Sequence, residues 1–131
     1  MFFLSIFIFS SSILISQNLS LEKLNSNLGA SFRGLDVINK KVVWVSGTQG
    51  TVLKTNDGGS TWEDVSVPNN TETDFRDIEA FDDKIAIVMG ISTPARFYKT
   101  NDGGKSWDLV YFNENKEVFF DGMSFWNKNN G

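Results

Sequence analysis

Cysteine and histidine are both absent from this 131-residue chain. Their absence excludes disulfides, thiolate nucleophiles, Cys/His zinc sites, haem and iron–sulfur ligation, and a histidine general base. Proline is scarce, with 2 residues, whereas the 11 glycines indicate many tight turns. We therefore expect no cofactor, no metal site and no catalytic residue in this chain.

Positive charge is also in short supply, because 12 Lys and Arg stand against 16 Asp and Glu, a formal net charge of −4. Nucleic acid is not an expected partner, since its phosphates require a basic surface. Large apolar side chains, by contrast, are plentiful. The chain holds 12 Phe and 4 Trp, an aromatic content that is too high for a disordered protein.

Residues 1–16, MFFLSIFIFSSSILIS, form an uncharged apolar run. The run is shorter than the about 20 apolar residues that a membrane-spanning helix needs, and its length suits the core of a secretory signal peptide. No Lys or Arg precedes the run, which leaves an uncleaved N-terminal anchor as the alternative. We expect a signal peptide cleaved before Gln17, an exported protein (periplasmic or secreted) and no stable membrane span afterwards.

An internal repeat is the strongest signal in the chain. Residues 54–65 (KTNDGGSTWEDV) and 99–110 (KTNDGGKSWDLV) are identical at eight of twelve positions. Upstream, residues 32–35 (FRGL) correspond to 75–78 (FRDI), and a third copy begins at 120–123 (FDGM). A period near 45 residues indicates repeated supersecondary units.

Each repeat contains four short stretches rich in β-branched and aromatic residues, separated by Gly, Asn or Asp, as in strands joined by hairpin turns. No useful helical period follows Leu28. Four antiparallel strands in about 45 residues make the blade of a β-propeller. The predicted fold is all-β: a β-propeller fragment of two four-stranded antiparallel blades plus the first strand of a third. The expected strands are 31–38, 42–46, 51–54 and 62–67, then 74–81, 84–89, 95–100 and 107–112. The expected boundaries are 17–29 for a lead-in segment, 30–68 for blade 1, 69–116 for blade 2 and 117–131 for the start of a truncated blade 3.

The repeated element between the third and fourth strands resembles the Asp-box, S/T-x-D-x-G-x-S/T-W, of sialidase-type propeller repeats. Its carboxylate can accept backbone hydrogen bonds across the turn, its glycines can take positive φ, and its Trp can pack beneath the turn. A calcium ligand is the alternative role, but no further carboxylates follow at alternate positions. The predicted structural residues are Thr55, Asp57, Gly59, Thr61 and Trp62, and Thr100, Asp102, Gly104, Ser106 and Trp107.

The repeat region as a whole resembles the photosystem II stability/assembly factor-like β-propellers. The resemblance rests on SFRGLDVINKKVVWVSGTQGTVLKTNDGGSTWEDVSVP, DFRDIEAFDDKIAIVMG and YKTNDGGKSWDLV, and it covers roughly residues 30–126. It implies an exported, non-catalytic propeller that acts as a protein-binding scaffold in assembly of a membrane complex. The partner's identity does not follow from it.

The chain is shorter than that resemblance requires. Even a four-bladed ring at this period needs about 180 residues. Two complete units and one first strand cannot close a ring. We expect either a truncated reading frame or blades supplied by another chain.

Three polar residues occupy equivalent positions in successive first strands: Arg33, Arg76 and Asp121. First strands line the central channel of a propeller, so these side chains would converge there and could hold a carboxylate-bearing protein partner. The resemblance also implies a basic patch for partner binding, which Arg33 and Arg76 could match. Alternatively, they are ordinary polar positions on alternating strands.

A sialidase-like glycoside hydrolase is the alternative function. The Phe-Arg pairs resemble the FRIP element of sialidases, although both copies lack the Pro. Such an enzyme also needs three arginines of this kind, a Tyr–Glu pair and an acid/base carboxylate. Tyr98 and Tyr111 flank the Asp-box hairpin rather than the channel. The four tryptophans, Trp44, Trp62, Trp107 and Trp126, could form a carbohydrate platform, but their positions favour packing within the blades.

Overall fold

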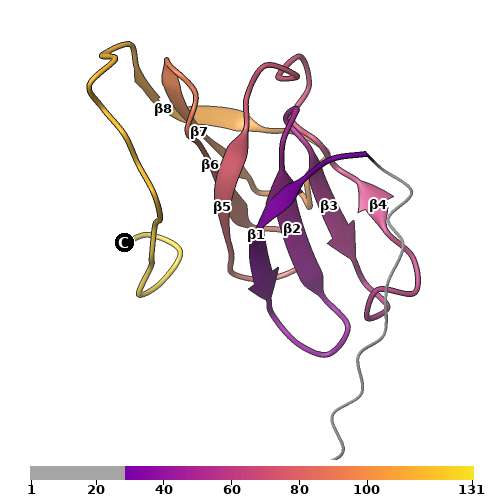
Figure 1. Ribbon diagram of the computed structural model, residues 1–131. Helices are drawn as coiled ribbons and strands as arrows, with labels where there is room; N and C mark the ends of the chain where they lie inside the picture. The colour runs from indigo at the N-terminus through magenta and orange to yellow at the C-terminus, as the bar shows by residue number, and fades with distance from the viewer. Residues whose placement is uncertain (1–28) are drawn as a thin grey trace, which may run out of the picture.

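The computed structural model describes residues 29–131, which form two four-stranded antiparallel sheets. The predicted signal peptide and all but the last residue of the lead-in lie outside the described residues. The first sheet has the order β1-β2-β3-β4 and the second the order β5-β6-β7-β8 (Figure 1). The strands are β1 (Phe32–Val37), β2 (Val43–Gly47), β3 (Val52–Thr55), β4 (Glu63–Asp64), β5 (Phe75–Ala80), β6 (Ala86–Gly90), β7 (Ala95–Thr100) and β8 (Asp108–Asn113). The predicted all-β fold with two four-stranded units is confirmed.

Within each sheet, every strand pairs with the next one along the chain, because short turns join them. Asn39 accepts the backbone N–H groups of Lys41 and Val42 at its Oδ1 in the β1–β2 turn. Asp82 does the same for Lys84 and Ile85 in the β5–β6 turn. These side-chain oxygens accept hydrogen bonds from N–H groups of the turn that have no backbone acceptor. Each unit is therefore a meander encoded by its own turns.

The core lies between the two sheets rather than within either. Unit 1 (β1–β4) contributes Trp44, Val52, Val65 and Val67. Unit 2 (β5–β8) contributes Phe75, Ile78, Ala80, Ala86, Val88 and Tyr98. Alternation along each strand places one row of apolar side chains on the face toward the other unit. The two units thus stack face to face, as Figure 1 shows.

β4 is shorter than the stretch 62–67 predicted from sequence, because a side chain interrupts the regular ladder after Asp64. The Val52 N–H donates to Ser66 Oγ at 3.0 Å instead of to a backbone carbonyl. The Ser66 N–H in turn donates to Asp64 Oδ1 at 3.0 Å. The regular ladder therefore ends at Asp64, although the Val65 and Val67 N–H groups still donate to the Val52 and Gly50 carbonyls at 2.9 and 3.2 Å. Val65 and Val67 remain buried.

Residues 117–131 differ from the prediction, because they contain no strand and one isolated bridge, between Asn127 and Asn130. In units 1 and 2 the first strand pairs with the second strand of its own unit. Residues 121–131 supply no such partner. The segment nevertheless starts beside β5, where the Met123 N–H donates to Asp77 Oδ2 at 2.8 Å.

Candidate functional site

Arg33 and Arg76 lie at the same irregularity in the first strand of each unit. In the β1–β2 ladder, Phe32 pairs with Gly47 and Gly34 pairs with Ser46, so Arg33 is an extra residue. The β5–β6 ladder omits Arg76 in the same way. An extra residue of this kind is a β-bulge, which turns its side chain away from the regular pleat. The sequence repeat predicted the equivalence of the two arginines but not the bulges.

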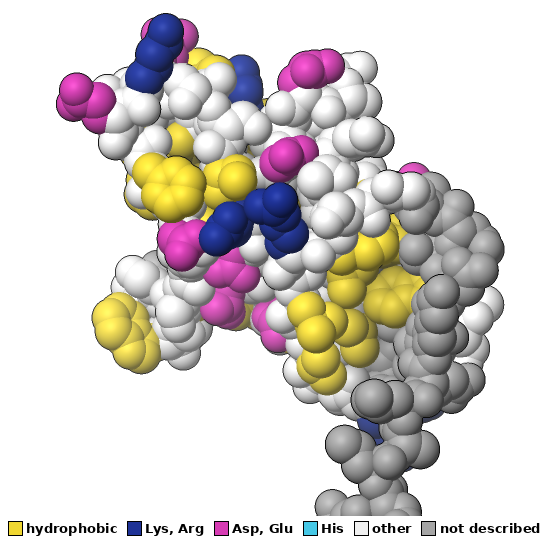
Figure 2. All heavy atoms as spheres, viewed as in Figure 1, with side chains coloured by type: hydrophobic (Ala, Val, Ile, Leu, Met, Phe, Trp, Pro, Cys, Tyr) yellow, Lys and Arg dark blue, Asp and Glu magenta, His cyan; other side chains and the backbone are white. Residues whose placement is uncertain are grey.

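β1 and β5 lie next to each other, so the two bulges share one side of the molecule. The Ala80 N–H on β5 donates to Asp36 Oδ2 on β1 at 2.6 Å. Gly34 makes this closeness possible, because a Cβ at that position would come within 2.9 Å of the Ile78 nitrogen. Figure 2 shows basic side chains gathered beside acidic ones in the middle of the face over these strands.

The structure brings two of the three predicted partner-binding residues into direct contact. Arg76 Nη2 lies 2.6 Å from Asp121 Oδ1. Both side chains remain accessible, with exposed fractions of 36% and 67%. Arg33 is exposed, and no ion pair found among residues 29–131 includes it. The three positions therefore form one ion pair with an exposed arginine on the adjacent strand.

Acidic residues that are not among the predicted site residues surround this pair. Partial burial, together with the charges of Asp36 and Asp77, raises the pKa of Glu79. Asp36 and Glu79 occupy equivalent positions in the two repeats, so the repeat pattern could have identified these two acidic residues. The face is thus a mixed-charge surface rather than a uniformly basic patch.

The carboxylate of each Asp-box is used within its own hairpin. Asp57 Oδ1 accepts the Thr61 N–H at 2.9 Å and the Thr55 hydroxyl at 2.8 Å, and Asp57 Oδ2 accepts the Thr61 hydroxyl at 2.7 Å. These hydrogen bonds from the Thr61 backbone, the Thr61 hydroxyl and the Thr55 hydroxyl lower the pKa of Asp57 to about 2. A carboxylate so engaged has little capacity left for a ligand.

The second Asp-box repeats this arrangement. The Ser106 hydroxyl and N–H donate to Asp102 at 2.6 and 2.9 Å. They lower the pKa of Asp102 to about 2, with a smaller contribution from Thr100. Within the described part of the chain, no group of three or more acidic side chains is placed to hold a metal ion.

Trp107 and Lys54 connect the two units instead of serving one hairpin. The Trp107 indole N–H donates to the Val65 carbonyl of unit 1 at 2.9 Å. Lys54 of unit 1 is buried and its ammonium donates to the Gly103 carbonyl of the second Asp-box at 2.9 Å. The Asp-box motif predicts a Trp beneath its own turn, and the repeat pattern gives no signal for Lys54. The Asp-box therefore also joins one unit to its neighbour.

The residues considered for sugar chemistry are dispersed. The Tyr98 hydroxyl donates to Asn70 Oδ1 at 2.7 Å, and the Tyr111 hydroxyl accepts from Asn113 at 3.0 Å. Trp44 is fully buried, whereas Trp126 is 86% exposed, so these two do not share a platform. Among the described residues no helix is long and apolar enough to cross a membrane.

A comparison with known protein families identifies the family that has this architecture. The family described as "Photosynthesis system II assembly factor YCF48" matches residues 15–118. The chain belongs to this family. Its two β-sheet units and Asp-box hairpins are thus repeats of a YCF48-type β-propeller, as the sequence resemblance predicted.

Two solved structures of YCF48 proteins are similar to this chain. "YCF48 bound to D1 peptide" has 24% identity and a TM-score of 0.57, and the match covers 71% of this chain and 30% of that one. YCF48 from Cyanidioschyzon merolae has 29% identity and a TM-score of 0.50, with 63% and 27% covered. No curated protein matches significantly. This chain therefore spans less than a third of either YCF48 structure.

Proposed function

We propose that this chain is part of an exported, protein-binding scaffold of the YCF48 type, and that its partner is a peptide segment bearing a carboxylate. Membership of an assembly-factor family supports the scaffold. A YCF48 structure that shares the fold was solved with a D1 peptide, which supports a peptide as the ligand. The uncharged apolar run at residues 1–16 supports export.

The pair Arg76–Asp121 is the observation that carries this proposal. Asp121 presents a carboxylate to Arg76 at 2.6 Å while remaining largely exposed. A carboxylate from a partner can replace it, because an exposed ion pair contributes little to stability and arginine binds carboxylates in a bidentate manner. Arg33, on the adjacent bulge, adds a second guanidinium to the same side of the molecule.

The surrounding acidic residues restrict what can bind. Asp36, Asp77 and Glu79 repel a segment that carries several negative charges. A peptide with uncharged side chains and a single free carboxylate pairs with the arginines and meets less of this repulsion. The proposed ligand is therefore a C-terminal segment with uncharged side chains and a free carboxylate, rather than an acidic stretch.

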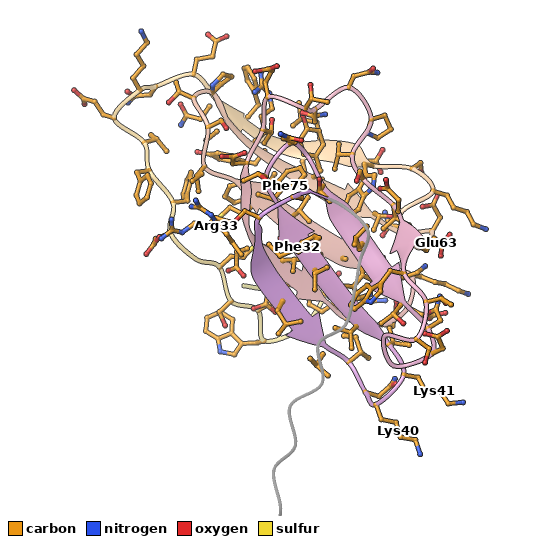
Figure 3. All side chains as sticks on the ribbon, turned by 45° about the vertical axis from the view of Figure 1, so that its right-hand side comes forward. Phe32, Arg33, Lys40, Lys41, Glu63 and Phe75 are labelled. Atoms are coloured by element: carbon orange, nitrogen blue, oxygen red, sulfur yellow. The ribbon has the colours of Figure 1, made fainter. Side chains whose placement is uncertain are left out.

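Fluorescence polarisation with a panel of labelled octapeptides that have uncharged side chains tests this proposal. Each peptide is compared as the free C-terminal carboxylate and as the amide. We expect the carboxylate form to bind, and the double variant Arg33→Gln/Arg76→Gln to weaken binding at least about tenfold. The matched control is Lys40→Gln/Lys41→Gln, which removes two charges from the β1–β2 turn, away from Arg33 (Figure 3). Equal binding of amide and carboxylate, or equal weakening by the control, would contradict the proposal.

A further inference from the structure

The fourth strands of the two units differ in length, although they occupy equivalent positions in the repeat. β4 has two residues, whereas β8 has six. In unit 1 the Ser66 hydroxyl and the Asp64 carboxylate interrupt the regular ladder. The equivalent residues of unit 2 are Tyr111 and Leu109. Because Leu109 has no carboxylate to hold such an interruption, the β7–β8 ladder continues as far as Asn113.

β8 is an edge strand whose outer side is unpaired. It pairs with β7 on one side, and no strand among residues 29–131 pairs with the other side. The opposite edge of the same sheet is β5, which lies beside β1 (Figure 1). Propeller blades pack on one another through their faces, so the edge formed by a fourth strand stays at the circumference whatever the number of blades. The exposure of this edge therefore does not depend on further units.

The edge of β8 lacks the features that normally protect such a strand. Propellers keep their blade edges short, and natural edge strands commonly carry charges or prolines that prevent pairing with another chain. Residues 109–113 contain no charge and no proline. Leu109, Val110 and Phe112 are 51%, 52% and 48% exposed. The outer backbone groups of β8 are thus open to pairing with a further β-strand.

A positive charge lies beside this edge. Arg96 on β7 pairs with Phe112 in the ladder, and its guanidinium lies over the Phe112 ring, 5.5 Å from the centroid. No ion pair found within residues 29–131 includes Arg96, and its hydrogen bond to the Pro94 carbonyl is long, at 3.5 Å. Cross-strand neighbours on one face of a sheet lie within reach of long side chains. An acidic side chain opposite Phe112 on an added strand would therefore complement this guanidinium.

We propose that β8 binds an extended segment of a partner protein, which adds to the second sheet as a fifth strand. The segment alternates apolar and polar side chains and carries one acidic residue opposite Phe112, where it pairs with Arg96. Main-chain hydrogen bonds supply the affinity, and the side chains beside the edge supply the preference. The proposal goes beyond the proposed peptide binding, because it needs no free C-terminal carboxylate and uses the edge of the sheet opposite Arg76.

Fluorescence polarisation with two labelled octapeptides tests the proposal. One peptide alternates Thr and Val and has Glu in place of a central Thr, and the other has Gln at that position. Both are amidated at the C-terminus, which removes the carboxylate required for binding at Arg33 and Arg76, so the two proposals succeed or fail separately. We expect the Glu peptide to bind about threefold more tightly than the Gln peptide. Arg96→Gln should abolish this difference.

Two variants remove the edge itself. Leu109→Asp places a charge on it, and Leu109→Asp/Tyr111→Ser copies the interrupted sequence of unit 1. Each should weaken binding of both peptides at least about tenfold. The matched control is Leu35→Asp, which changes a leucine of β1 that is 64% exposed and should leave binding unchanged. Circular dichroism should show that every variant is folded.

Amide hydrogen exchange measured by NMR reports strand addition directly, and exchange within residues 108–113 should slow when the Glu peptide is bound. Failure of both peptides to bind would overturn the proposal, as would equal affinity for the two. Equal weakening by Leu35→Asp, or unchanged exchange within β8, would also overturn it. So would a dimer of this chain that Leu109→Asp dissociates and that binds neither peptide, because a second copy would then occupy the edge.

Discussion

The two Asp-box hairpins have nearly the same internal hydrogen bonds but different surroundings. Asp57 and Asp102 each accept a backbone N–H and two hydroxyls from their own loop. Only the second hairpin packs on another described unit, through Trp107 and Gly104. The eight-position Asp-box motif specifies the conformation of the hairpin turn. The adjacent unit determines which groups of that hairpin become buried.

Replacing equivalent valines should give the largest difference between the units. Val65→Ala removes two methyl groups from the interface between the sheets and should lower the free energy of unfolding by about 2 kcal/mol. Val110→Ala changes an exposed side chain and should stay within about 0.5 kcal/mol. Urea denaturation followed by tryptophan fluorescence, at concentrations where the chain is monomeric, measures both. Equal losses would mean that the units do not stack as described.

The equivalent lysines should differ by a smaller amount. Lys54→Met removes a buried ammonium that donates to the Gly103 carbonyl at 2.9 Å and the Asp83 carbonyl at 3.4 Å. We expect a loss of about 1 kcal/mol, because methionine keeps the apolar stem but leaves carbonyls unpaired. Lys99→Met should have almost no effect on the same denaturation curve. A larger loss of stability at Lys99 than at Lys54 would contradict the assignment of Lys54 to the contact between units 1 and 2.

The Asp-box carboxylates should give the smallest effect and an equal one in both units. The pKa values of Asp57 and Asp102 are about 2 in the folded protein, against an ordinary value of 3.8. A lowered folded-state pKa stabilises the protein above the unfolded value, and this stability is lost as pH falls from about 4 towards 2. Asp57→Asn and Asp102→Asn should each flatten the decline of melting temperature over that range. Unequal flattening would show that the hairpins are not electrostatically equivalent.

The sequence predicted what is local. Both meanders follow from alternating apolar stretches between Gly, Asn and Asp turns, and the Asp-box motif anticipated the carboxylate hydrogen bonds. The contacts between units could not be read in this way. Trp44 and Asp82, joined by an indole hydrogen bond of 3.1 Å to the Asp82 carbonyl, lie 38 positions apart. Their proximity depends on how the sheets stack.

The candidate site was predictable only in part for the same reason. The repeat register identified Arg33, Arg76 and Asp121 as equivalent positions, and the structure pairs Arg76 with Asp121. The β-bulges that carry both arginines depend on a one-residue mismatch between paired strands, which no periodicity reveals. The strand expected near Phe120 did not form, because pairing needs a second strand that residues 121–131 do not provide.

The bond from the Trp107 indole to the Val65 carbonyl has a consequence for how such proteins lengthen in evolution. Its acceptor belongs to the backbone, which every repeat supplies regardless of sequence, and its donor belongs to the most repetitive stretch of the chain. An in-frame tandem duplication of about 45 codons would therefore create a new contact between units in which the indole donor and the carbonyl acceptor are both already present. Blade number can change in a single genetic event, without prior adaptation of either surface.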